Sequence, residues 1–398
     1  MRDLQSTGVA GVIALPMAQI KAGRLKIIDP ENQSYIVEGI KKGPEAAIRI
    51  TDKKLLRRLL VVPDLYLGEG YMDGSIVVEE GTLYDVLDFC AINLMPLPGE
   101  GGPVVSAPVQ KLNVIGQAQT NVAHHYDLNR KLFELFLDTD LQYSCAYFAN
   151  DRDSLEQAQA NKRRRLAAKL LLKPGMRVLD IGCGFGGLAL EMAREHGVEV
   201  VGVTLSEEQW RAGQERAKAA GLDKQVTFKL CDYREETETY DRIVSVGMFE
   251  HVGSRHYDEF FSKIRDLLVD DGIALLHSIG RMAQPGSALV WINRYIFPGG
   301  YTPALSETVA AVERAGLWIT DVEILRLHYA YTLREWHNRF QRNRNQAQEL
   351  YDERFCRMWE FYLQISEVAF RRLNWMVFQI QLTKSVDAAP ITRSYLNE

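Results

Sequence analysis

The segment at residues 178–187, VLDIGCGFGG, constrains the fold of this chain more than any other. An apolar run typical of a buried strand leads directly into a turn with four glycines, Gly182, Gly184, Gly186 and Gly187. Glycine lets a ligand approach the backbone closely, and the start of the following helix offers free N–H groups. The turn therefore predicts a nucleotide-type ligand, and the alternative is a turn that merely packs. No P-loop lysine follows, which argues against a bound triphosphate.

Short apolar runs alternate with amphipathic segments on both sides of this turn. The predicted strands are RVLDIG, VEVVGVTL, VTFKL, YDRIVSV and GIALLHSI, and the predicted helices between them include residues 188–196, 207–220 and 256–268. Strict alternation of strand and helix predicts an α/β fold, a doubly wound and mostly parallel sheet with helices on both faces. Residues 282–372 are mainly helical in pattern and rich in aromatic residues, so we expect a helical cap over the sheet.

The chain of 398 residues is long enough for two domains. Residues 21–105 combine short strands with helices at 52–60 and 83–94, and a glycine-rich turn is predicted at 67–74. Residues 96–103 are the densest in proline and glycine and read as a linker. We therefore expect a smaller N-terminal α+β domain with its linker at 1–105, and a larger domain at 106–398. The apolar stretch at 8–20 is expected to be a tail or a first helix rather than a signal peptide.

Composition excludes several classes of protein. The net charge of −5 argues against nucleic acid as a partner. No run of eighteen apolar residues exists, so no membrane-spanning helix is expected. The five cysteines are scattered and form no CxxC pair, which favours a reducing cytoplasm and argues against a structural metal site.

Polar residues follow the predicted strands where ligands bind in open α/β sheets. Asp180 precedes the first glycine, where a carboxylate would receive an ammonium group or a ribose hydroxyl. Thr204 ends the second strand, and with Gln209 it would bind ribose hydroxyls. The third strand is followed by Asp232, Tyr233 and Arg234. There Asp232 would accept from an adenine amino group and Tyr233 would pack on the ring, with a solvated loop as the alternative.

A second group of side chains is predicted to converge on the same crevice. Glu250 and His251 follow the fourth strand, and His277 holds a similar place on the fifth. Each histidine alone is as easily a structural group as a catalytic one. Upstream, the segment QYSCAYF places Cys145 beside Ser144 and two tyrosines, although a free cysteine is usually a small buried hydrophobe.

Together these motifs resemble the cyclopropane-fatty-acyl-phospholipid synthase family, which includes the mycolic acid cyclopropane synthases. The glycine turn alone is similar to motif I of class I S-adenosylmethionine-dependent methyltransferases. The segments that carry the resemblance are HHYDLNRKLFELFLD, QYSCAYF, KPGMRVLDIGCGFGGLA, VVGVTLSEEQ, CDYRE, YDRIVSVGMFEHVG, LLHSIG, WINRYIFPGG and HYAYTLREW. They extend over most of residues 124–378, and LYLGEGYMDG at 65–74 extends the resemblance into the first unit.

The resemblance implies a Rossmann-like class I methyltransferase fold and a specific chemistry. S-adenosylmethionine gives its methyl group to a cis double bond of an acyl chain in a membrane phospholipid, and a bound bicarbonate removes a proton so that a cyclopropane ring closes. The positions that would hold the bicarbonate are the side chains of Cys145, Glu250, His277 and Tyr329 and the backbone near Ile279. The expected S-adenosylmethionine-binding residues are Tyr143, Ser144, Asp180, Gly182, Gly184, Gly186, Gly187, Thr204, Gln209, Asp232, Tyr233 and Arg234.

This chemistry sets physical requirements for the site. An alkene is a poor nucleophile, so the site must align it with the methyl group and keep out water, which would trap a cation. Aromatic faces that would favour passing positive charge are Tyr143, Phe148, Phe249, Trp291 and Tyr295. An ionised Glu250 and an anion are both acceptors, so we expect Glu250 to be protonated beside bicarbonate or bridged to it by a donor such as His277.

Three other functions stay open at this point. Relatives with this fold also methylate without closing the ring and leave a methyl or methylene branch. A non-catalytic lipid-binding protein and a methyltransferase acting on oxygen or nitrogen of a small molecule are the others. Phe185 stands where family members often have tryptophan, and because an aromatic is retained we expect little change.

The resemblance also implies that the protein docks on a membrane. Lys53, Lys54, Arg57 and Arg58 alternate with pairs of leucines in an amphipathic basic helix, which would bind the lipid surface unless it is a plain surface helix. The basic stretch at 162–165 is expected to be a solvated helix face. Longer family members are often homodimers, so we expect a homodimer in the cytoplasm, peripherally associated with the inner face of the membrane.

Overall fold

The computed structural model describes residues 20–94, 129–286 and 289–396, which form two compact units. The smaller unit comprises residues 1–104, 289–296 and 333–374, and the larger unit comprises residues 105–288, 297–332 and 375–398. The first unit separates after Val104, beside the linker predicted from the sequence. The predicted linker itself and nearly all of the apolar stretch at 8–20 lie outside the described residues.

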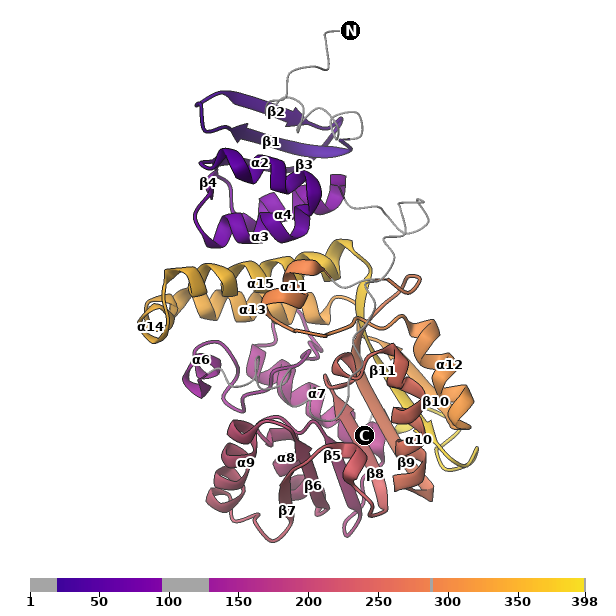
Figure 1. The fold of residues 1–398 in the computed structure, drawn as a ribbon. Helices are drawn as coiled ribbons and strands as arrows, with labels where there is room; N and C mark the ends of the chain where they lie inside the picture. Colours follow the sequence, from indigo (N-terminus) through magenta and orange to yellow (C-terminus); the bar gives the residue numbers. More distant parts are fainter. Residues whose placement is uncertain (1–19, 95–128, 287–288, 397–398) are drawn as a thin grey trace. The chain divides into compact units, whose positions relative to one another are not determined.

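A seven-stranded sheet forms the centre of the larger unit (Figure 1). Its order is β10-β11-β9-β8-β5-β6-β7, and the pairs from β9 to β7 are all parallel. The bounds are β5 Arg177–Ile181, β6 Glu199–Thr204, β7 Val226–Leu230, β8 Tyr240–Val246, β9 Leu268–Arg281, β10 Trp318–Ile324 and β11 Trp375–Thr383. The fold is thus the doubly wound, mostly parallel α/β fold that the alternation of strands and helices predicts.

Helices cover both faces of this sheet because its strands are apolar on both faces. Leu179 and Ile243 join a core with α10 and α12, whereas their neighbours Val178 and Val244 join a core with α7 and α8. Successive side chains of a strand point to opposite faces, which explains this division. The helix bounds are α6 Arg130–Glu134, α7 Leu155–Leu170, α8 Gly187–His196, α9 Glu207–Ala219, α10 Tyr257–Leu267 and α12 Leu305–Ala315.

Two strands of this sheet were missed by the sequence analysis. β10 lies in a segment predicted to be mainly helical, and β11 follows it without any predicted element. β11 pairs antiparallel with both β9 and β10 and is buried almost throughout. Apolar and polar residues alternate from Phe378 to Thr383 in β11, which is a strand pattern that the sequence analysis overlooked. β10 is partly exposed along its whole length and was hidden by the helical segments on both sides of it.

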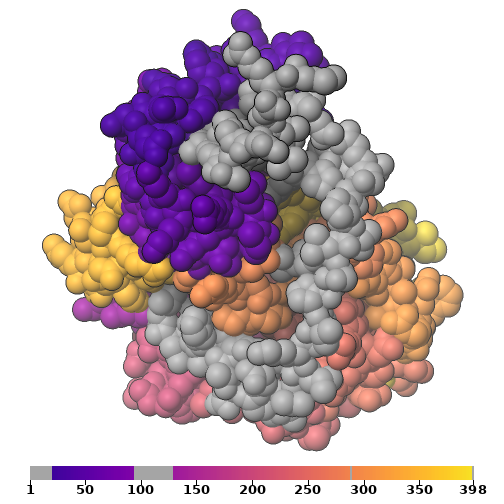
Figure 2. Space-filling view, turned by 45° about the horizontal axis from the view of Figure 1, so that its top comes forward, coloured from indigo at the N-terminus to yellow at the C-terminus, as the bar shows by residue number. Residues whose placement is uncertain are grey.

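The smaller unit contains a four-stranded sheet in the order β2-β1-β3-β4, as expected for a small α+β domain. Its strands are β1 Ala22–Ile28, β2 Ser34–Glu38, β3 Lys41–Ile50 and β4 Ile76–Glu80, and its first helices are α2 Lys53–Val61, α3 Pro63–Met72 and α4 Leu83–Leu94. This part of the chain presents a broad exposed surface, indigo in Figure 2. The cap predicted at 282–372 is divided, since its segments at 289–296 and 333–374 group with this unit. They form α11 Val290–Tyr295, most of α13 His328–Arg342, α14 Arg344–Leu350 and α15 Glu353–Arg372.

The predicted glycine-rich turn at 67–74 is wrong, because residues up to Met72 belong to helix α3. A Cβ atom on Gly68 would lie 2.3 Å from the Trp291 ring, and one on Gly70 would lie 2.8 Å from Leu55. The glycines therefore serve close packing of the helix rather than a turn.

The basic stretch at 162–165 on α7 is also not the solvated face that the sequence predicts. Only Arg164 is exposed. Arg163 pairs with Asp138 and Asp140, and Arg165 makes two hydrogen bonds to Glu323, at 2.8 and 2.5 Å. Acidic residues from distant segments reach these cations, which local sequence does not reveal.

Candidate active site

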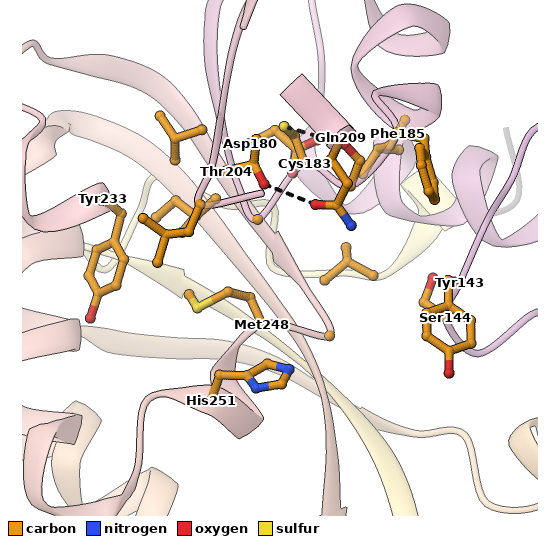
Figure 3. Close-up of a pocket in the computed structure, with 18 of the residues that line it drawn as sticks. Tyr143, Ser144, Asp180, Cys183, Phe185, Thr204, Gln209, Tyr233, Met248 and His251 are labelled. Carbon is orange, nitrogen blue, oxygen red and sulfur yellow. Dashed lines mark hydrogen bonds between the residues drawn. The ribbon is translucent and has the colours of Figure 1, made fainter. Parts of the chain in front are cut away.

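A pocket opens at the carboxyl ends of the parallel strands (Figure 3). It is lined by the glycine-rich turn after β5, by residues at or after the ends of β6, β7 and β8, and by residues 141–144. Eleven of the twelve residues predicted to bind S-adenosylmethionine line it: Tyr143, Ser144, Asp180, Gly182, Gly184, Gly187, Thr204, Gln209, Asp232, Tyr233 and Arg234. The twelfth, Gly186, is the N-cap of α8 with φ of 79°, and a Cβ there would lie 2.5 Å from Phe228. Gly186 therefore shapes the turn without lining the pocket.

The glycine turn has a backbone that other residues would strain. Gly182 and Gly184 have φ of 79° and 56°, in the left-handed region. A Cβ on Gly182 would also lie 2.8 Å from Met248, and one on Gly187 would lie 2.4 Å from Asp140. The turn thus keeps its backbone open toward the pocket.

The polar groups beyond β6 and β7 are already paired with one another. The Thr204 hydroxyl donates to Gln209 Oε1 at 2.9 Å, as Figure 3 shows, so the Gln209 amide nitrogen remains a donor. Asp232 accepts from the backbone N–H of Arg234 at 3.0 Å and from its guanidinium at 2.9 and 2.7 Å. Sequence reasoning placed Asp232 and Arg234 here but did not foresee their ion pair. A carboxylate has about four acceptor positions, so Asp232 retains capacity for a further donor.

Seventeen other residues, which sequence reasoning did not assign to the cofactor, also line the pocket, among them Gln142, Met248 and His251. Burial lowers the pKa of His251 to about 4, so this imidazole is neutral at physiological pH. Burial also raises the pKa of Asp180 to about 7, although the nearby Lys162 cation opposes that shift. His251 lies at the crevice to which the sequence analysis assigned it, without a role in cofactor binding. For Gln142, its adjacency to Tyr143 was the available sequence signal.

The five residues predicted to hold the base lie outside the lining of this pocket. Cys145, Glu250, His277 and Tyr329 are all buried. Glu250 and Ile279 are in direct contact, because the backbone N–H of Ile279 donates to Glu250 Oε1 at 2.6 Å. The other Glu250 oxygen is buried and has no hydrogen-bond partner among the described residues. Burial raises the pKa of Glu250 to about 7, so a large fraction of this side chain is protonated at neutral pH.

His277 has a defined hydrogen-bond polarity. The Gln379 amide nitrogen lies 3.0 Å from His277 Nδ1. An amide nitrogen can only donate, so Nδ1 accepts and neutral His277 carries its proton on Nε2. Burial, helped by the Lys162 and Lys169 cations, lowers the pKa of His277 to about 3. His277 therefore stays neutral and presents an N–H donor.

The start of α13 holds the Cys145 segment in place. Thr332 Oγ1 accepts from the backbone N–H of Ala146 at 3.0 Å, and His328 Nδ1 accepts from that of Phe148 at 3.1 Å. Tyr329 lies on the same turn of α13 as His328 and Thr332. Burial raises the pKa of the Cys145 thiol, so the thiol is neutral.

The aromatic side chains predicted to stabilise positive charge lie in different parts of the structure. Tyr143 lines the pocket and packs against Phe133 at 5.3 Å between ring centroids. Phe148 packs beside Tyr331 at 5.8 Å. Phe249, by contrast, is fully buried and stacked on Tyr257, so its face is occupied by the core. The faces of Trp291 and Tyr295 belong to the smaller unit, where their rings pack together at 5.5 Å.

Neither a spanning helix nor a metal cluster appears in the described parts of the protein. No helix among them is long and apolar enough to cross a membrane. The same residues include no group of three or more histidine, cysteine, aspartate or glutamate side chains that could hold a metal ion.

Comparisons with known proteins bear on this geometry. A family model described as mycolic acid cyclopropane synthetase matches residues 115–380. The cyclopropane-fatty-acyl-phospholipid synthase of Escherichia coli strain K12 is 40% identical over 345 residues, which cover 86% of this chain and 89% of that protein. A probable fatty acid methyltransferase of Pseudomonas putida is 35% identical over 343 residues, covering 84% and 85%. Among solved structures, a mycolic acid cyclopropane synthase complexed with SAH and CTAB has a TM-score of 0.64 and 36% identity, covering 66% of this chain and 97% of that one.

Proposed function

The chain belongs to the mycolic acid cyclopropane synthetase family of S-adenosylmethionine-dependent methyltransferases, and from that premise we propose that it makes cyclopropane fatty acids. It transfers a methylene group from S-adenosylmethionine to the cis double bond of an unsaturated acyl chain in a membrane phospholipid. The observation that carries the proposal is the presence, in one unit, of a nucleotide-type pocket and of the buried side chains Glu250 and His277, whose charged forms burial disfavours.

The pocket offers a partner for each part of the methyl donor. When bound, S-adenosylmethionine supplies an activated methyl group on its sulfonium sulfur. Thr204 and Gln209 would bind its ribose hydroxyls, and Asp232 and Tyr233 would hold the adenine. The carboxylate of Asp180 would accept from the ammonium group. The positive charge of nearby Lys162 favours this ionised form of Asp180. The open backbone of the glycine turn lets the ligand lie close to β5.

The ring closes when a base removes one proton from the transferred methyl carbon, and we propose bicarbonate as that base. Cys145, Glu250, His277, Tyr329 and the backbone near Ile279 would hold it. A protonated Glu250 would donate from the oxygen that has no protein partner, and His277 would donate from Nε2. Two neutral donors suit an anion, because no like charge opposes its entry. Burial of this group also excludes the water that would trap a cation as an alcohol.

The acyl chain lies in a bilayer, so the protein must reach a lipid surface. On helix α2, Lys54 and Arg57 are exposed, and Leu60 and Val61 are 50% and 76% exposed. Exposed cations beside exposed apolar side chains favour binding to an anionic membrane. We therefore propose peripheral association with the inner face of the cytoplasmic membrane. The family resemblance alone supports a homodimer as the working form.

A second candidate is a methyltransferase that acts on a carbon atom of the acyl group and leaves a methyl or methylene branch. The similarity to a protein named as a probable fatty acid methyltransferase favours it. The two candidates share the cofactor and the alkene and differ after methyl transfer. Ring closure bonds the transferred carbon to the second alkene carbon as a proton leaves, whereas the alternative loses a proton to form a new double bond and leaves a methyl or methylene branch on an alkene.

One experiment separates them. Purified protein is incubated with methyl-labelled S-adenosylmethionine and vesicles of cis-monounsaturated phospholipid, and the released acyl esters are analysed by mass spectrometry. Gain of one labelled CH2 with resistance to mild hydrogenation is the expected result. A labelled product that still takes up hydrogen would establish the branched alternative. Absence of label in lipid, with cofactor binding intact, would contradict both.

Substitutions test the proposed roles of the buried group. Glu250→Gln should lower the rate of ring formation about tenfold, because an amide is a weaker donor to an anion than a protonated carboxyl group. Cys145→Ser should also lower it. A matched control is Glu236→Gln, another buried glutamate, which pairs with Lys229 outside the pocket and should retain most of the rate. Wild-type rates in both Glu250→Gln and Cys145→Ser would contradict the assignment.

A further inference from the structure

Lys162 is a buried cation that the mechanism above does not use. Its side chain on α7 is 1% exposed, and its ammonium donates to Gln142 Oε1 at 2.5 Å and to Ser144 Oγ at 2.8 Å. Within the described ranges, no carboxylate forms a salt bridge with it. A buried charge is costly unless it is compensated, so its retention next to two neutral side chains calls for a reason.

A second buried lysine on the same helix shows the ordinary arrangement. Lys169 is fully buried, and its ammonium lies 2.6 Å from Glu323 and 3.7 Å from Asp321. Two carboxylates thus neutralise Lys169. Lys162 differs because both of its partners, Gln142 and Ser144, line the pocket.

An ammonium group can only donate, and this fixes the polarity of both partners. Gln142 must present its carbonyl oxygen to Lys162, so its amide nitrogen points away and donates to Asp140 at 3.1 Å, with one N–H left over. Ser144 must accept from Lys162, so its own hydroxyl proton is available to another acceptor. The pocket therefore receives two hydrogen-bond donors backed by a positive charge.

Hydrogen-bond donors that lie next to a cation favour binding of an anionic group, such as the carboxylate at the amino-acid end of the ligand. Figure 3 separates Tyr233 from Tyr143 and Ser144 across the pocket, with Thr204 and Gln209 between them. With adenine at Tyr233 and ribose at Thr204, the amino-acid end of the ligand would extend toward Ser144. The Lys162 charge also acts on Asp180, favouring the ionised form that would receive the ligand's ammonium group.

We propose that Lys162 is a positioning residue that orients Gln142 and Ser144 as donors to the carboxylate of the methionine part of S-adenosylmethionine. This inference rests on the proposed function only for the identity of the ligand. It assigns Lys162 no contact with the reacting atoms.

The test compares two ligands that differ only at the amino-acid end. S-adenosylhomocysteine carries it, and 5′-methylthioadenosine keeps the adenosine and sulfur but lacks it. Lys162→Met should weaken binding of S-adenosylhomocysteine at least about tenfold, because hydrogen bonds to a charged group are lost. Binding of 5′-methylthioadenosine should change less than about threefold. Equal losses for both ligands, or no loss for either, would overturn the proposal.

Lys169→Met is the matched control, since it removes a buried lysine from the same helix without touching a pocket residue. It should lower the melting temperature and leave the ratio of the two affinities unchanged. The same selective loss in Lys169→Met would overturn the proposal, because the effect would then not belong to Lys162.

Ser144→Ala keeps the test decisive if Lys162→Met does not fold. It retains the lysine and removes one of the two donors, so it should reduce the preference for S-adenosylhomocysteine. An unchanged preference in the folded variant would overturn the proposal. Both measurements need no lipid, so a failure to label phospholipid would contradict the proposed function and leave this result standing.

Discussion

Helices α2 and α7 each carry a basic stretch with four cations, KKLLRR and KRRR, but the two stretches differ in their exposure to solvent. All four cations of α2 are exposed, whereas only Arg164 is exposed on α7. On α7 the acidic partners come from segments far away in sequence, such as Glu323 for Arg165. On α2 one cation, Lys53, pairs with Glu31, and no described carboxylate pairs with the side chains of Lys54 or Arg57.

The comparison teaches that the number of charges in a stretch does not decide its role. On α7, acidic residues pair with two of the cations, Arg163 and Arg165, and so allow them to be half-buried. Their scarcity around α2 leaves cations available for an external anionic surface. Three substitutions would break or sharpen this contrast.

The largest effect is expected on the interior side. Glu323→Gln leaves the fully buried Lys169 with only the more distant Asp321, at 3.7 Å, and should lower the free energy of unfolding at pH 7 by about 3 kcal/mol. Urea denaturation measures this difference. A loss below about 1 kcal/mol would mean that the α7 cations behave as surface charges.

The same variant predicts a pH dependence. Burial raises the pKa of Glu323, but hydrogen bonds and charge from Arg165 and Lys169 outweigh it and lower the pKa to about 2. Because the folded pKa lies below the unfolded value of about 4.3, the stabilisation is complete above that value and is lost as pH falls toward 2. The difference between wild type and Glu323→Gln should therefore shrink between pH 5 and 2. A difference that stays constant would contradict this ion-pair account.

The next effect is expected on the exposed side. Replacing Lys54 and Arg57 together by glutamine should weaken binding to anionic phospholipid vesicles by about 2 kcal/mol, or roughly thirtyfold. Vesicle co-sedimentation at fixed salt measures it. Replacing the exposed Lys218 and Lys224 of the larger unit changes the net charge equally and should have little effect. Equal losses in both double variants would mean that overall charge, and not α2, binds the vesicle.

The smallest effect concerns the apolar end of α2. Val61→Ser should weaken vesicle binding by about 1 kcal/mol, because less apolar surface enters the lipid. This loss should persist at high salt, whereas the contribution of the cations should fade. Ile36, which is 47% exposed on β2, offers the control Ile36→Ser. Unchanged binding by Val61→Ser would remove this residue from the docking surface.

The sequence predicted those parts of the fold and of the site whose interacting residues lie close together in the chain. The glycine turn, the five parallel strands and eleven of the pocket-lining residues follow from residues close together in the sequence, such as Thr204 and Gln209. Features that depend on distant partners were missed. The Lys162 ammonium meets Gln142 twenty residues away, and β11 finds its place only between β9 and β10. The residues proposed to hold bicarbonate came from the family resemblance and stay predictions.

The position of β11 has a consequence for synthesis of the protein. It is made after every other strand of the larger sheet, yet it lies between β9 and β10. While the ribosome is still making the segment before residue 375, β9 therefore has an unpaired edge of buried character. Such an edge is a template for pairing with other chains. Completion of the sheet must therefore follow emergence of β11 from the ribosome.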